Sequence, residues 1–295
     1  MRRQPHLVVA AALTAVLVSA CAAPPAGIDG ELVDDWRELP AAHQFTPRAG
    51  DCHAIADPTV ENYQPVECQQ PHVLETIHVG TFTGELAERP TPPRFHSAVM
   101  RPAFAECDAK ARAFVGADWR DGRLGVQAVP PSVPGWQGGA RWFRCDLFVL
   151  SGDRNANGAP DSIMQQAGSL RDALTGTSPL AHTCFDLYYQ GGGLKATGCA
   201  DPHRYEYVGI WTTPVQRRAD VDRDPEAVHA RCRTLVYRYA KVPAGREVRT
   251  GTTYRLPSEQ GWARGDRGVR CFFWSGGPTI NRSVRGSGAS AIKIP

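Results

Sequence analysis

The alternation of hydrophobic and polar positions predicts the same short series of elements in each half of the chain. In the first half, residues 73–82 have the pattern of a strand, with Val73, Ile77 and Val79 on one side. Two further strands are expected over residues 124–129 and 141–150, separated by a turn that contains a Gly-Trp pair. A helix is expected between the first strand and these two, with Pro102 near its start and apolar positions at Val99, Ala103, Cys107, Ala111 and Phe114.

The second half of the chain repeats this order. Strands are expected over residues 204–212, 252–256 and 268–274. Asp224 suits the N-cap of a helix and Pro225 suits its first turn. Apolar positions then recur at helical spacing at Val228, Cys232, Leu235 and Tyr239. The predicted fold is therefore α+β, a tandem duplication of a small antiparallel sheet with one packed helix.

Two sequence motifs that occur twice support the duplication. The motif C-x-x-P-H-x-x-E begins at Cys68 and again at Cys199. The longer motif P-S-x-x-G-W-x-x-G-x-R-x-x-R-C begins at Pro131 and again at Pro257. We expect a first repeat over residues 40–152, a linker over 153–164, a second repeat over 165–278 and a loose tail over 279–295, with a short helical piece at 162–174.

The start of the chain predicts export and lipid anchoring. The apolar run from Leu7 to Ala20 has 14 residues, too short for a membrane-spanning helix of about 20 but typical of a signal sequence. It ends in Val-Ser-Ala-Cys, so residues 1–20 are expected to be removed and Cys21 to carry acyl chains that hold the protein on the outer face of the cell membrane. Residues 21–39 then form a tether. The alternative is a plain secretory signal with an incidental cysteine.

The other eight cysteines are expected to form disulfides, because the chain is exported and their number is even. Four cysteines allow three pairings in each repeat. The favoured pairs are Cys52–Cys68, Cys107–Cys145, Cys184–Cys199 and Cys232–Cys271.

Composition narrows the function only a little. The formal net charge is +3 and no strong basic field is evident, so a nucleic-acid partner is not expected. Residues 153–161 resemble the start of a calcium-binding loop, but Met164 stands where the loop needs a bidentate Glu, so an ordinary turn is favoured and no metal is expected. No cofactor motif and no nucleophile with partners is found, so the chain is not expected to be an enzyme.

The paired motifs, the helix cysteine and the Trp-Gly-Arg-Cys ending resemble the septum formation domain family of actinobacteria. The resemblance covers about residues 40–152 and 165–277. It implies an envelope location and a link to the division septum, but no enzymatic reaction.

The best candidates for a site are the His and Glu of the shorter motif: His72, Glu75, His203 and Glu206. They could bind a metal or perform acid–base chemistry. A structural role is favoured, because residues three apart on a strand face opposite sides. In that interpretation His72 caps the turn after Pro71, and Glu75 pairs with an arginine such as Arg141.

Two further pairs are binding candidates. Trp136 and Trp262 could stack on sugar rings of the wall, although burial under the turn is favoured. Arg144 and Arg270 could meet acidic polymers or anionic headgroups, although a solvated or salt-bridged strand face is favoured. The sequence thus predicts a non-catalytic module that binds an envelope protein or a wall component. The alternatives are a ligand-binding lipoprotein with a pocket between the repeats, and an envelope hydrolase.

Overall fold

A computed structural model describes residues 45–56, 63–151, 162–187, 193–246 and 248–294. The chain divides into two compact units, residues 1–43 and 44–295, and the description concerns the second. The signal sequence, Cys21, the tether and the calcium-like segment at 153–161 lie outside the described residues.

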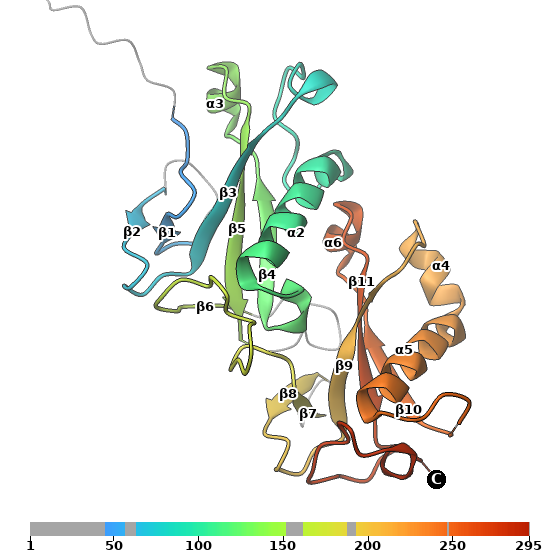
Figure 1. Cartoon of the computed structure of the whole chain (residues 1–295). Helices are drawn as coiled ribbons and strands as arrows, with labels where there is room; N and C mark the ends of the chain where they lie inside the picture. The colour runs from blue at the N-terminus through green and yellow to red at the C-terminus, as the bar shows by residue number, and fades with distance from the viewer. Residues whose placement is uncertain (1–44, 57–62, 152–161, 188–192, 247, 295) are drawn as a thin grey trace, which may run out of the picture. The chain divides into compact units, whose positions relative to one another are not determined.

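Two antiparallel sheets have the same strand order (Figure 1). The order is β2-β1-β3-β5-β4 in the first sheet and β8-β7-β9-β11-β10 in the second, and β6 also pairs with the end of β5. The first sheet contains β1 (Cys52–His53), β2 (Pro65–Val66), β3 (Leu74–Thr81), β4 (Leu124–Val129), β5 (Trp142–Leu150) and β6 (Ile163–Met164). The second contains β7 (Cys184–Leu187), β8 (Leu194–Thr197), β9 (Tyr205–Thr212), β10 (Gly251–Arg255) and β11 (Gly268–Trp274). The predicted α+β fold is confirmed, and the two matching sheets fit a tandem duplication.

One long helix packs on each sheet, α2 (Arg101–Val115) on the first and α5 (Pro225–Ala240) on the second (Figure 1). Asp224 caps α5 as expected, since its carboxylate accepts a hydrogen bond from the Ala227 N–H. The remaining short helices are α3 (Val133–Gln137), α4 (Arg218–Arg223), α6 (Glu259–Ala263) and the 3-10 turns η1 (Gly84–Leu86), η2 (Ala98–Met100), η3 (Trp119–Asp121) and η4 (Ala289–Ala291).

A β-bulge lies at the same place in both sheets. The β3–β5 register shifts between Thr76 and His78, and the β9–β11 register passes over Val208. The expected alternation along the first strand was therefore wrong. Val73, Ile77 and Val79 are only half-buried, whereas Leu74 and Thr76 are buried, and the extra residue of the bulge at Ile77 breaks the two-residue period within β3.

Four disulfides join the eight cysteines between residues 52 and 271, in the predicted pairs. Cys107–Cys145 ties α2 to β5, and Cys232–Cys271 ties α5 to β11. The loops that they close, with separations of 38 and 39 residues, correspond to about 4 kcal/mol of stabilisation each in the chain-entropy account.

The segments that follow each last strand are not the linker and loose tail that we expected. Residues 162–174 form β6 and turns rather than a helix, because β6 pairs with Val149 and Leu150 of β5. Leu170 is buried in the first core. In the tail, Val284 and Ile292 are buried in the second core. The first repeat therefore continues to about residue 181, and the second runs from there to the described end of the chain.

Candidate functional site

The two motif glutamates fasten the segments that follow the last strands. We call residues 166–174 the first strap and residues 280–288 the second strap. The Glu75 carboxylate accepts hydrogen bonds from the Ser169 hydroxyl at 2.6 Å and the Leu170 N–H at 2.7 Å. Bonds of this kind to a buried carboxylate contribute roughly 1.5–3 kcal/mol each.

Glu206 does the same in the second repeat. Its carboxylate accepts from the Ser283 hydroxyl at 2.6 Å and the Val284 N–H at 2.7 Å, and also from the Tyr239 hydroxyl at 2.9 Å. Glu75 and Glu206 are 3% and 0% exposed, so solvent reaches neither carboxylate. Each glutamate is a buried anchor for its strap.

Backbone hydrogen bonds fix both straps at matching points. Each strap pairs with the motif histidine, His72 with Gln166 and His203 with Ile280. Further along, each strap donates two N–H groups to the last carbonyls of the long helix, so the strap satisfies groups that a helix end leaves unpaired. The matching donors and acceptors are Asp172 to Phe114, Leu174 to Val115, Gly286 to Tyr239 and Gly288 to Ala240.

The predicted partner of Glu75 was wrong. Arg141 donates instead to the carbonyls of Ala87, Trp136 and Ala140, because it lies at the other end of the sheet beside α3. The expected role of His72 in its turn is confirmed, since its Nδ1 bonds to the Gln70 carbonyl at 2.8 Å.

The two motif histidines differ in their second ring nitrogen. His72 Nε2 faces the Gln166 side-chain amide at 3.2 Å, whereas His203 Nε2 faces Glu206 Oε1 at 3.2 Å. The expectation that a His and a Glu three residues apart face opposite sides was therefore wrong in the second repeat. The reason is that β9 begins at Tyr205, so His203 precedes the regular strand.

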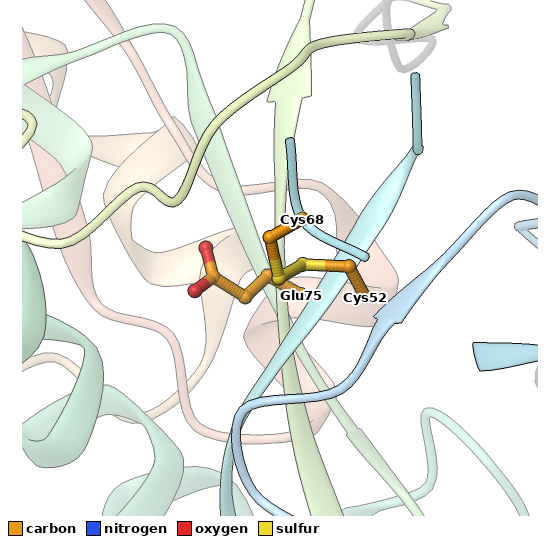
Figure 2. A group of neighbouring side chains, drawn as sticks. All are labelled: Cys52, Cys68 and Glu75. Atoms are coloured by element: carbon orange, nitrogen blue, oxygen red, sulfur yellow. A yellow bond between two sulfur atoms is a disulfide. The ribbon is translucent and has the colours of Figure 1, made fainter. Parts of the chain in front are cut away.

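Each glutamate also lies beside the neighbouring disulfide. Ligand atoms of Cys52, Cys68 and Glu75 lie within 4.8 Å of one another, as do those of Cys184, His203 and Glu206. Figure 2 shows Glu75 beside the bridged Cys52 and Cys68. Zinc sites use cysteine thiolates, and these sulfurs are bonded in pairs, so both groups serve as packing around a disulfide.

Both motif tryptophans are buried. Trp136 and Trp262 are 1% and 5% exposed and lie in α3 and α6, the short helices that form where a simple turn was expected. Their indole N–H groups donate to the Arg89 and Gln216 carbonyls at 2.7 and 2.8 Å. An arginine guanidinium covers one ring face in each case. Neither ring offers a face to a sugar.

The paired arginines before the last cysteines are also engaged. Arg144 is 2% exposed and forms an ion pair with Asp146 at 2.9 Å. Arg270 donates to the Arg120 carbonyl at 2.9 Å. The favoured salt-bridged interpretation holds for Arg144, although that side chain is buried rather than solvated.

Sequence patterns gave no sign of a buried charged contact between the repeats. Arg120 of η3 is 3% exposed and forms ion pairs with Asp108, Asp118 and Asp266. Gly268 leaves room for it, since a Cβ at that position would meet the Arg120 side chain. Arg120 and Asp266 are 146 residues apart in the sequence, and local motifs carry no information about pairs so far apart.

A second polar contact lies beside this one. The Tyr207 hydroxyl donates to Asp121 at 2.5 Å. Burial raises the pKa of Tyr207 well above its usual value and also raises the pKa of Asp121. Burial lowers the pKa of the neighbouring His182 well below its usual value. These groups hold the two repeats together through buried polar atoms.

The model of the septum formation family matches residues 49–271. The chain belongs to the septum formation family. The match is one span that includes most of both repeats, and it covers the disulfides, both motif pairs and the first strap. No curated protein and no solved structure shows a significant match to this family member. Among the described residues, no helix is long and apolar enough to cross a membrane.

Proposed function

We propose that this family member is a lipid-anchored, non-catalytic interaction protein of the cell envelope that acts at or near the division septum. One observation carries most weight. The polar side chains shared by the two repeats point inward and bond to the protein itself, as the two glutamates do with their straps. This leaves the outer surface, rather than a cleft of shared polar residues, as the binding surface.

The proposed location rests on two features. Four disulfides are typical of a protein that folds in an oxidising compartment outside the cytoplasm. The apolar run that ends at Ala20 is the proposed signal, and Cys21 directly after it is the proposed acylation site. Two or more acyl chains would give stable attachment to the membrane, whereas a single chain gives only marginal binding.

A ligand-binding role is the second candidate, and a cavity of about 490 Å³ favours it. The cavity lies within the first repeat, beneath the first strap, rather than between the repeats as the sequence suggested. Its walls are mostly apolar and its size is within the usual range for small-molecule sites. The lining includes Val149, Met164, Leu170, Ala173, Pro179 and Leu180.

Imaging of a tagged full-length chain in dividing cells tests the proposed function, with Cys21→Ala as the matched control. Enrichment at the septum that the control loses would support an anchored septal protein. An even distribution of both forms around the envelope would contradict the septal role. A purified chain that hydrolyses wall polymers would contradict the non-catalytic role and favour the envelope hydrolase.

A further inference from the structure

The two repeats carry opposite net charges. Residues 45–181 contain 12 basic and 15 acidic residues, whereas residues 182–295 contain 18 basic and 10 acidic residues. The formal charges are therefore −3 and +8. The small net charge of the whole chain is thus the sum of an acidic first repeat and a strongly basic second repeat. The positive electrostatic field of the second repeat attracts anionic ligands and speeds their association.

A cavity of about 480 Å³ opens in this basic repeat. It lies between the middle of α5, the start of β10 and the end of the chain. Its lining is Arg233, Tyr237, Val248, Arg249, Thr250 and Ile294. The Tyr237 hydroxyl donates to the Val248 carbonyl at 2.8 Å, so this part of the wall is held in place without a ligand.

Two guanidinium groups border the cavity. Arg249 is exposed, and its side chain makes no hydrogen bond or ion pair with any described residue. Arg233 bonds to Glu226 through one terminal nitrogen and has further N–H donors available. A guanidinium matches the oxygens of a phosphate in a two-point contact, and two guanidiniums beside one cavity favour a phosphate group over a single carboxylate oxygen.

Thr250 adds a buried polar group without a partner. The residue is 7% exposed, and its hydroxyl finds no hydrogen-bond partner among the described residues. Buried hydroxyls are nearly always bonded, so an unpaired one beside a basic cavity indicates an absent acceptor. A phosphate oxygen is an acceptor of the required kind.

Among the described residues, the first repeat does not contain this combination of side chains. Asp108 directly follows Cys107 of α2, as Arg233 directly follows Cys232 of α5, so the matching position of the first repeat carries the opposite charge. Leu124 precedes Gly125 as Thr250 precedes Gly251, and it is fully buried in the core. Arg123, the counterpart of Arg249, donates to the Ser151 and Pro179 carbonyls. Among the described residues, the cavity with two arginines and an unpaired threonine hydroxyl therefore belongs to the second repeat.

We propose that this cavity binds a phosphate group of an anionic envelope ligand, with Arg233 and Arg249 contacting the phosphate and Thr250 donating to one of its oxygens. The group could belong to a lipid headgroup or to a phosphate-containing polymer. The proposal does not depend on whether the protein acts at the septum.

Calorimetric titration of the full chain in neutral detergent with inorganic phosphate tests the site. One saturable site is expected, and its affinity should fall as the salt concentration rises. Arg249→Gln should weaken binding about tenfold or more, because it removes a charged donor. Arg231→Gln is the matched control: it removes the same charge from an exposed position of α5 outside the cavity, and should change affinity less than about twofold. Thr250→Val should weaken binding by a smaller factor.

A second arm separates the two sources of phosphate. The full chain with Cys21→Ala is sedimented with phosphatidylglycerol vesicles or with phosphatidylcholine vesicles. Binding to the anionic vesicles alone, reduced by Arg249→Gln, would identify a headgroup. Phosphate binding without vesicle binding would identify a soluble or polymeric phosphate. The absence of saturable phosphate binding, or an equal loss in Arg249→Gln and Arg231→Gln, would overturn the proposal.

Discussion

The two repeats have the same framework but different polar chemistry. Strand order, the β-bulge, the disulfides and the strap on a buried glutamate all recur. The residues around that framework have diverged. His72 is satisfied by a neutral amide, whereas His203 faces a carboxylate, and the cavity bordered by Arg233 and Arg249 lies beside α5 of the second repeat. Backbone pairing and disulfides preserve a fold, while the side chains at its surface can take on separate roles.

Loss of the helix disulfide should give the largest effect, and the same effect in both repeats. The double variant Cys232→Ser/Cys271→Ser should lose about 4 kcal/mol of unfolding free energy, because the denatured chain regains the freedom of a 39-residue loop. The matched double variant at Cys107 and Cys145 should lose the same amount. Urea unfolding measures the free energy of both double variants. A much smaller loss in one of them would show that the two helix disulfides do not stabilise their repeats equally.

The buried arginine between the repeats should come next. Arg120→Met should cost about 3 kcal/mol, because removing one partner of a buried ion pair leaves carboxylates without their counter-charge. Arg112→Met is the control, since Arg112 contacts two of the same aspartates but is 44% exposed in its side chain. The control should cost less than about 1 kcal/mol. Similar losses in the two variants would show that Arg120 is not the main link.

The glutamate anchors should differ between the repeats. Glu206→Gln should lose about 2 kcal/mol and Glu75→Gln about 1 kcal/mol, because an amide nitrogen then faces N–H and O–H donors. Glu206 faces the larger set, since the Tyr239 hydroxyl joins its strap donors. Chemical unfolding of the two variants compares them directly. A larger loss of unfolding free energy in Glu75→Gln than in Glu206→Gln would contradict this prediction.

The smallest expected effect is a pH dependence at the contact between the repeats. Burial, with Arg264 nearby, lowers the pKa of His96 to about 4, and the neutral ring accepts a hydrogen bond from the Arg264 guanidinium. The unfolded chain binds the proton near pH 6.5, so the contribution of His96 to stability is complete above that pH. It is lost as the pH falls from about 6.5 to about 4. The free energy of unfolding, measured across this pH range, should change less steeply with pH in His96→Gln than in the unaltered chain. An unchanged dependence on pH would contradict the proposed contribution of the His96–Arg264 contact.

The sequence predicted those parts of the fold that local patterns encode. Helical spacing located α2 and α5, and the duplicated cysteines predicted all four disulfide pairs. It missed the straps, because Gly- and Ser-rich segments have no hydrophobic period. A signal was nevertheless present, since Ser-Leu-Arg at 169–171 follows the last cysteine of the first repeat and Ser-Val-Arg at 283–285 follows that of the second, although the two spacings differ.

The site residues were harder to interpret. The motif His and Glu were selected as candidates, but the strap partners of the two glutamates lie some 75 to 95 residues away and no local rule predicts them. The bulge that disrupts strand alternation also gives no clear pattern. The basic cavity depends on side chains from three separated segments, so it becomes visible only in the folded chain.

Amide hydrogen exchange tests the central claim most directly, namely that each buried glutamate fastens the strap of its own repeat. The Leu170 and Val284 amides should both be strongly protected in the unaltered chain. Glu206→Gln should release the Val284 amide and leave Leu170 protected, and Glu75→Gln should do the reverse. Rapid exchange of Val284 in the unaltered chain, or protection that neither substitution changes, would contradict the account.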